Sequence, residues 1–400
     1  MTKPLEGVRI IDLSQYLPGP LAIQMLADFG AEVIKVEVLH GELGRTAPPQ
    51  IEGNRAHYYN VNRNKRSLAL DMKDPEGKEV FKKLVEQADV VFEQFRPGAM
   101  DRMGLGYEEL RKVNKRIVHC ALTGYGYSGP LKMAAGHDNN YLALSGILDI
   151  SGTKESGPVL VGTQIADIAG GTLHSVIAIL LALQARERTG EGQFCDVSMT
   201  DAVCSTMLAY VLADYWGNGK VPAREQDSLN GGTAFYNVYR TSDGKYVTLG
   251  AVEPKFWETF CRKMRHEDWI PLRNSADSSV QEQMKGTLRR EFAEKTQREW
   301  VEFFSDVDIC FAPIIGIDEM VKHPQVIERA SVIKEENFLG SGRDAYFPGI
   351  PIKLSETPGE AVLSWSGLGA DSRAILESLG YGEGDVERLV EKGVIGIPRE

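Results

Sequence analysis

Short β-branched runs alternate with amphipathic helical runs along the first third of the chain, and this alternation restricts the fold more than any other feature. Residues 8–14 (VRIIDLS) and 32–37 (EVIKVE) are strand-like, and residues 19–30 between them carry apolar side chains at helical spacing. The same alternation of helix and strand continues to residue 123. It predicts an α/β fold class with a mostly parallel, doubly wound sheet.

The turn after the first predicted strand argues against a nicotinamide cofactor. Residues 14–20 (SQYLPGP) contain two prolines and lack the G-x-G-x-x-G pattern that forms a tight turn around a pyrophosphate. The predicted parallel sheet is therefore expected to bind something other than a dinucleotide.

The composition changes at residues 217–232, which are polar and rich in glycine, as is typical of a boundary between domains. After it, residues 235–252 alternate as a hairpin around the turn at Asp243, and Thr296 with Glu299 forms a capping box that starts a helix. We therefore expect a first domain at 1–224 and a smaller α+β domain at 225–330.

Charge and residue usage argue against several classes of partner. The 400-residue chain has a net charge of -11 without a block of like charges, so no nucleic-acid partner is expected. Its 5 cysteines are scattered without C-x-x-C spacing, which indicates reduced thiols in a cytoplasmic protein. The histidines lack metal-ligand spacing, so no metal is expected.

One long apolar run, residues 165–183, needs an interpretation because of its length. Asp167 and His174 interrupt it, and Gly170 with Gly171 break its start. We interpret it as a buried helix and expect no membrane association. The first residues of the chain also lack the apolar segment of a secretory signal.

A polar cluster stands directly before an apolar run at residues 136–146 (GHDNNYLALSG). Such a cluster is how many helices start, so His137 has a structural interpretation as a cap and Asp138 one as an N-cap or hydrogen-bond acceptor. Imidazole also titrates near neutrality, and partial burial of a carboxyl group, as expected for Asp167, raises its pKa toward the same range. The two side chains therefore have a second interpretation as an acid/base pair.

Several motifs together identify the chain as similar to a known family. They are GVRIIDLSQYLPGPLAIQMLADFGAEVIKVE, FRPGAMDRMGLGYEEL, LTGYGYSGP, GHDNNYLALSG, ADIAGGTLHSVIAILLAL, ERTGEGQFCDVSM and LGADSRAILESLGY. Over essentially its whole length the chain resembles the family III CoA-transferases and alpha-methylacyl-CoA racemases. The resemblance implies an interlocked homodimer and an acyl-CoA thioester substrate, with coenzyme A as part of the substrate and no separate cofactor. It also implies a large Rossmann-like domain built from both chain ends, here 1–224 and 331–400.

The racemase branch of this family is the closer match. Its Gly-His-Asp-x-Asn-Tyr motif, its catalytic aspartate and its Glu-Pro dipeptide correspond to His137, Asp167 and Glu253, and the resemblance implies that the glutamate supports the histidine. Racemisation needs one group to remove the α-proton of the thioester and another to return a proton on the opposite face. We therefore expect a 2-methylacyl-CoA racemase.

The alternative is a CoA-transferase, in which a single carboxylate attacks the thioester and carries CoA as an aspartyl thioester. Asp167 occupies that position of the family too. Asn139 and the stretch 162–166 depart from the racemase pattern, so the choice between the two reactions stays open.

Basic residues are expected to hold the phosphates of coenzyme A, because these anions need guanidinium or ammonium groups. Two segments, GELGRTAPP and NRNKRSLAL, border the nucleotide in the family, and the FRPG arginine contacts CoA there. The expected contacts are Arg45, Arg63, Lys65, Arg66 and Arg96.

Overall fold

The computed structural model describes residues 2–275 and 277–398, which divide into two compact units. Unit 1 comprises the described parts of Met1–Leu142, Thr163–Met207 and His323–Glu400, and unit 2 comprises Ala143–Gly162 and Leu208–Lys322. Both chain ends therefore belong to one unit. The expected boundary at residue 225 lies inside unit 2, because the glycine-rich stretch around it is fixed to that unit: the Asn237 side chain and Lys285 both donate to the carbonyl of Gly231.

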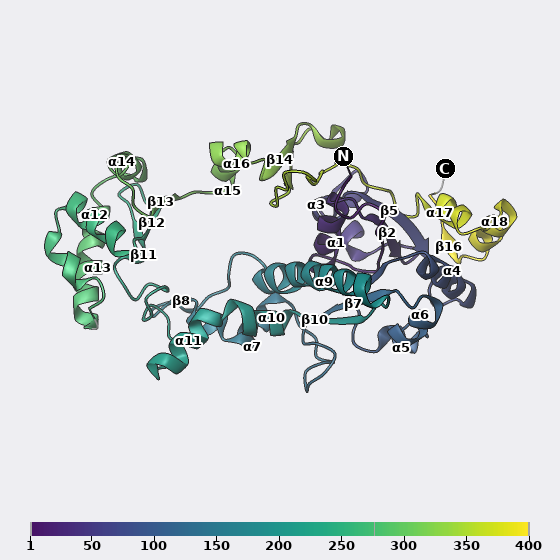
Figure 1. Ribbon diagram of the computed structural model, residues 1–400. Helices are drawn as coiled ribbons and strands as arrows, with labels where there is room; N and C mark the ends of the chain where they lie inside the picture. Colours follow the sequence, from purple (N-terminus) through teal and green to yellow (C-terminus); the bar gives the residue numbers. More distant parts are fainter. Residues whose placement is uncertain (1, 276, 399–400) are drawn as a thin grey trace. The chain divides into compact units, whose positions relative to one another are not determined.

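Unit 1 is built on a seven-stranded sheet in the order β10-β7-β6-β1-β2-β5-β16. Figure 1 labels β10, β7, β2, β5 and β16 of this sheet. All neighbouring strands are parallel except β16, which runs antiparallel to β5 at the edge. The strands are β1 (Arg9–Asp12), β2 (Glu32–Glu37), β5 (Lys65–Leu70), β6 (Val90–Glu93), β7 (Val118–Thr123), β10 (Phe194–Ser198) and β16 (Ile395–Gly396). The predicted α/β class with a mainly parallel sheet is confirmed.

Helices cover both faces of this sheet, as the apolar strands require. One face packs against α4 (Pro75–Glu86), α6 (Tyr107–Val113), α17 (Ser372–Ser378) and α18 (Glu383–Glu391), whose apolar side chains share one buried cluster with the strands. The other face contacts α1 (Pro18–Asp28) and α9 (His174–Thr189). Asp74 caps α4, with its carboxylate accepting from the amide of Glu76.

Short elements complete unit 1. They are α2 (Leu43–Thr46), β3 (Gln50–Ile51), β4 (Asn54–Arg55), α3 (Ala56–Val61), α5 (Ala99–Arg102), α10 (Met199–Ala202), η2 (Val203–Met207), α16 (Pro324–Glu328), β14 (Val332–Glu335), η4 (Phe338–Gly340) and β15 (Ala345–Pro348). Helix α7 (Asp138–Ser145) begins in unit 1 and ends in unit 2.

The long apolar run forms a continuous helix from Ala166 to Thr189, in which a π-helical segment, η1 (Ala166–Leu173), leads into α9. By length and composition this helix is long and apolar enough to cross a membrane, and 50% of its most apolar window is buried within the protein. Gly170 and Gly171 allow it to approach α10, since a Cβ at Gly170 would lie 2.9 Å from the carbonyl oxygen of Met199. Its open side exposes four apolar side chains, Leu173, Ile177, Leu180 and Leu181.

Unit 2 contains a three-stranded antiparallel sheet of β11 (Tyr236–Arg240), β12 (Tyr246–Gly250) and β13 (Phe311–Ile314). One face of it packs against α12 (Pro254–Met264), α13 (Ser278–Phe292) and α14 (Gln297–Phe303) around a buried aromatic cluster. The predicted capping box of Thr296 and Glu299 starts α14. The remaining elements are α8 (Ile147–Ile150), β8 (Gly152–Thr153), β9 (Gly157–Pro158), α11 (Ala209–Asn218), η3 (Glu267–Leu272) and α15 (Ile317–Met320).

Candidate active site

A cavity of about 860 Å³ opens in unit 1 beyond the carboxyl ends of β1, β6 and β7. The chain passes from β1 to β2 on one side and from β6 to β7 on the other, so the strand order reverses between β1 and β6. In doubly wound sheets ligands bind at this switch point, because the loops on either side diverge there. The cavity brings together His137, Asp167 and Arg96.

His137 stands immediately before α7, and its backbone serves the helix start. Its amide donates to Oδ1 of Asn140 at 3.0 Å, and its carbonyl accepts from the amides of Asn140 and Tyr141. The imidazole takes no part in this capping: it is exposed, lines the cavity and has no hydrogen-bond partner among the described residues. The two interpretations of this histidine are therefore compatible, because its backbone caps the helix while its imidazole lines the cavity.

Asp167 lies in the first turn of η1, a π-helical segment of the kind often found at functional sites. Its backbone amide donates to Oδ1 of Asp138 at 3.0 Å, which fixes the start of this helix against the start of α7. Burial and the Asp138 carboxylate raise the pKa of Asp167 to about 6, against an opposing effect of His137. Asp138 is thus the acceptor that the sequence predicted, and it also influences the charge of Asp167.

Two amides at the start of this helix are already hydrogen-bonded within the protein. The amide of Asp167 is bonded to Asp138, and that of Ile168 donates to the carbonyl of Gln164 at 3.0 Å. An oxyanion on the substrate would need other donors, since a backbone amide in a good hydrogen bond is already satisfied.

Tyr141 contributes to the cavity wall while using its hydroxyl locally. The hydroxyl donates to the carbonyl of Gly136 at 2.6 Å, and the ring packs edge-on against Tyr125 at 5.1 Å between centroids. This contact holds the His137 segment against the loop that follows β7.

Glu253 belongs to unit 2, where it is the exposed N-cap of α12 without a side-chain capping bond. Its charge contributes to a raised pKa of Cys310, behind the effect of burial. Cys310 lines a second cavity, of about 640 Å³, in unit 2. The support of His137 by Glu253 stays a prediction.

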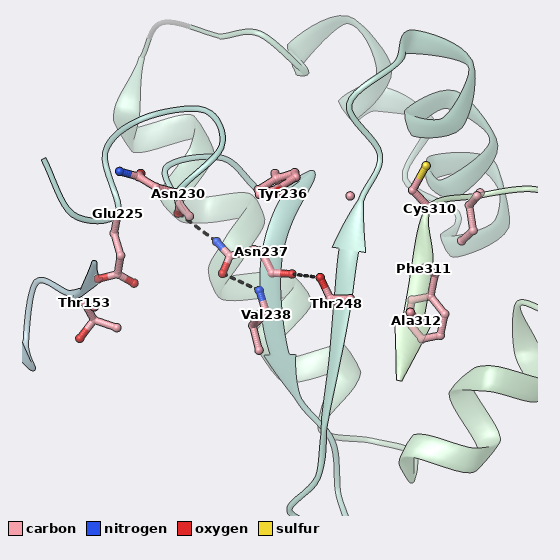
Figure 2. A pocket seen from close by; sticks show the side chains of 14 residues that line it. Thr153, Glu225, Asn230, Tyr236, Asn237, Val238, Thr248, Cys310, Phe311 and Ala312 are labelled. Atoms are coloured by element: carbon pink, nitrogen blue, oxygen red, sulfur yellow. Dashed lines mark hydrogen bonds between the residues drawn. The ribbon is translucent and has the colours of Figure 1, made fainter. Parts of the chain in front are cut away.

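Figure 2 shows this second cavity with side chains from β11, β12 and β13. Its amide groups are used within the unit: Asn237 donates to Gly231 at 2.9 Å, and Asn230 donates to Asp227 and to the carbonyl of Ala223. One oxygen of Glu225 accepts from the amide of Lys154 at 2.8 Å. These polar groups serve the folding of unit 2.

Three of the five expected phosphate contacts are buried and already paired. Arg63, 1% exposed, makes two bonds to the Asp28 carboxylate at 2.9 and 2.6 Å, and Arg45 makes two to Glu37 at 2.8 Å each. Lys65 uses its ammonium on Asp12, Asn62 and the carbonyl of Pro20. These cations stabilise the sheet and its loops, and none of the three lines the cavity.

The other two expected contacts differ from each other. Arg66 is partly exposed and bonded to Glu32 at 3.0 Å, away from the cavity lining. Arg96 is exposed, lines the cavity and has no ion-pair partner among the residues that the structure describes. Arg55 and Lys132 also line the cavity, although the sequence did not single them out. Only the folding of their loops brings them there, so no local signal marks them.

Within 2–275 and 277–398, no group of three or more His, Cys, Asp or Glu side chains is arranged to hold a metal ion.

Comparison with known proteins gives consistent matches along nearly the whole chain. The model of CoA-transferase family III matches residues 5–372. The chain is 35% identical to alpha-methylacyl-CoA racemase of Homo sapiens, over 98% of this chain and 97% of the relative. It is 34% identical to succinyl-CoA:glutarate CoA-transferase of Mus musculus, over 98% and 90%. A crystal structure of a CAIB/BAIF family protein from Brucella suis superposes with a TM-score of 0.81 at 29% identity, covering 95% of this chain and 100% of that one.

Proposed function

Because this chain belongs to CoA-transferase family III, we propose that it acts on an acyl-CoA thioester as a 2-methylacyl-CoA racemase. The similarity to a racemase over 98% of the chain supports this proposal. The mouse CoA-transferase is almost as similar, so the choice between reactions rests on the side chains of the cavity.

One observation carries the proposal: two side chains that can transfer a proton, His137 and Asp167, line the same cavity. The His137 imidazole is exposed and unbonded among the described residues, and the pKa of the Asp167 carboxyl is raised to about 6. A general acid or base works best when its pKa is near the operating pH. CoA transfer needs the carboxylate alone and would leave the imidazole without a role.

The proposed reaction has two steps. One of the two groups removes the α-proton, and the electron pair of the C–H bond moves into the thioester to give an enolate. The other group then donates a proton to the opposite face of that carbon. The enzyme returns to its starting charge after a reverse cycle or after proton exchange with water, so no further reactant is needed.

Arg96, Arg55 and Lys132 are the proposed partners of the coenzyme A phosphates, because they line the cavity together. Guanidinium groups form paired hydrogen bonds with phosphate, and an ammonium group adds a compact charge. Glu253 is proposed to orient His137, and a homodimer is proposed as the working form.

The second candidate is a CoA-transferase with Asp167 as nucleophile, favoured by 34% identity to succinyl-CoA:glutarate CoA-transferase over 98% of the chain. Its carboxylate would attack the thioester carbonyl and expel CoA as the thiolate, which leaves a mixed anhydride on Asp167. The thiolate would then attack the aspartyl carbonyl, forming an aspartyl thioester and releasing the donor acid as its carboxylate. Hydroxylamine or borohydride trapping of Asp167 after exposure to acyl-CoA alone detects this route.

His137→Ala separates the two candidates. Racemisation should fall by about two to four orders of magnitude, the usual contribution of a general acid or base. A transferase should keep most of its activity, since its nucleophile is intact. Retained turnover with trapped Asp167 would replace the racemase proposal with the transferase.

A further inference from the structure

Glu93 is a buried carboxyl that the proposed reaction does not use. It ends β6, is 0% exposed, and directly precedes Gln94, Phe95, Arg96 and Pro97, which form one wall of the cavity. A carboxyl group buried at the base of a cavity wall is costly unless its oxygens are hydrogen-bonded. The hydrogen bonds that Glu93 accepts therefore indicate its role.

The two carboxyl oxygens bind two different walls of the cavity. Oε2 accepts from the backbone amide of Phe95, which fixes the turn that presents Arg96. Oε1 accepts from the hydroxyl of Tyr127 at 2.6 Å. Tyr127 follows Thr123, Gly124 and Tyr125 of the second wall and begins the loop that leads to His137.

The Tyr127 side of this bond is itself firmly placed. Its amide donates to the carboxylate of Asp196 on β10, at 3.0 Å to the nearer oxygen, and its ring packs edge-on against Phe194 at 4.9 Å between centroids. Glu93 therefore joins a fixed point on the second wall to the turn that carries Arg96.

Resting on the proposed function, we propose that Glu93 and Tyr127 are positioning residues, which hold the Arg96 turn and the His137 loop in the arrangement that binds coenzyme A. Neither residue touches the substrate. Their effect is expected on the affinity for coenzyme A, through the placement of Arg96.

The hydrogen bonds that Glu93 accepts from Phe95 and Tyr127 should respond to pH. Burial raises the pKa of Glu93 to about 7, against the hydrogen bonds from Tyr127 and Phe95, and the charge of Asp101 on α5 raises it further. From β7, the Nε2 atom of His119 lies 4.0 Å from Oε1, but burial lowers the pKa of this histidine to about 4, so it is neutral here. The Cys120 thiol, also on β7, has its pKa raised well above the usual value and stays protonated.

The sign follows from hydrogen bonding. Above pH 7 the ionised carboxylate accepts strongly on both oxygens, whereas the neutral acid keeps only one good acceptor oxygen. Both contacts are therefore strongest above pH 7, and coenzyme A should bind more tightly there. Removing the Tyr127 hydroxyl removes a bond that favours the ionised form, so Glu93 should then titrate at a higher pH.

Calorimetric titration of coenzyme A into the wild type, Glu93→Gln and Tyr127→Phe, across a series of pH values around 7, tests this inference. The wild type should gain about two- to tenfold in affinity over Glu93→Gln as the pH rises, the range expected for one hydrogen bond. Tyr127→Phe should show a smaller gain, because only the contact with the Phe95 amide remains, and this gain should come at a higher pH. The titration of the coenzyme A phosphates contributes equally to all three proteins and cancels in the ratios.

Tyr239→Phe is the matched control, since it removes another buried tyrosine bond, to the carbonyl of Ala234 at 2.7 Å in unit 2. Its binding profile should keep the wild-type midpoint. An affinity ratio of wild type to Glu93→Gln that stays flat or falls with pH, or an unchanged midpoint in Tyr127→Phe, overturns the inference alone. A wild type that does not bind coenzyme A overturns the proposed substrate class and this inference with it.

Discussion

At the scale of single residues, the charged side chains that line the cavity differ from the charged side chains that stabilise the fold. Arg63 and Arg96 illustrate this: one is buried in a two-bond contact with Asp28, and the other is exposed at the cavity wall. Asp138 and Asp167 differ in the same way, because the first accepts a backbone hydrogen bond that positions the second.

Asp138→Asn tests how the charge of Asp167 is set. Burial and the Asp138 carboxylate raise the pKa of Asp167, so removing that negative charge should lower it below its present value of about 6. The asparagine oxygen can still accept from the Asp167 amide. Either proposed reaction stops when a further proton binds and leaves no base or no nucleophile in the cavity. Because Asp167 would bind that proton at a lower pH in the variant, the acid limb of the pH profile of kcat/KM should move to lower pH. An unmoved acid limb, or one moved upward, would contradict this assignment.

Arg96→Ala and Arg63→Met should fail in different ways. The first should weaken coenzyme A binding by roughly tenfold, the effect of losing a hydrogen bond to a charged group, with an unchanged melting temperature. The second leaves the buried Asp28 carboxylate without its ion-pair partner, which should destabilise the fold by about 3–5 kcal/mol. Calorimetric binding and denaturant unfolding of both variants measure the two effects. Loss of affinity in a fully stable Arg63→Met protein would restore Arg63 as a direct phosphate contact.

At the scale of elements, the close approach of the η1 helix to α10 places Asp167. Gly170→Ala would put a Cβ 2.9 Å from the Met199 carbonyl oxygen, a backbone atom that cannot move away easily. The variant should lose about 1–3 kcal/mol of unfolding free energy through overpacking, together with activity, because Asp167 lies one turn earlier. Gly286→Ala in α13 is the control: its Cβ would meet only the Arg290 side chain at 3.9 Å, so stability should rise by about 0.4–1 kcal/mol. Equal stability of the two variants in thermal unfolding would contradict the packing argument.

The same scale shows how far the sequence predicts the structure. The strand at 32–37 was predicted at its observed bounds, and the capping box of Thr296 and Glu299 starts a helix as predicted, because a clear period or a cap specifies a short element locally. The interpretation of 63–66 as a phosphate-binding segment did not foresee that Lys65 opens the buried strand β5. A lysine is rarely buried unless it is paired, and the partner of Lys65, Asp12, is 53 residues away in the sequence. Only the tertiary structure therefore explains why Lys65 is buried. His137 and Asp167 were predicted, whereas Arg55, Lys132 and the Glu93–Tyr127 bond required the fold.

At the scale of the whole molecule, the apolar side chains on the open side of α9 favour a second copy of the chain as a partner. Ile177 and Leu181 are 50% and 65% exposed one turn apart, on a helix whose other side is buried. Light scattering should therefore give a mass twice the 44.2 kDa of the chain. Ile177→Glu with Leu181→Glu should weaken the dimer, while Ile327→Glu, at a 61% exposed isoleucine on α16, should not. A wild type that is monomeric throughout the concentration range would contradict the dimer.

The central claim is that the cavity moves a proton at the α-carbon of a thioester. A 2-methylacyl-CoA of one configuration, incubated with the wild type in deuterium oxide, should take up one deuterium at that carbon while both configurations appear. His137→Ala should lose the exchange. An α-proton that stays in place across several acyl chains, while CoA passes to an added carboxylic acid through a trappable Asp167, would contradict the racemase and establish the transferase.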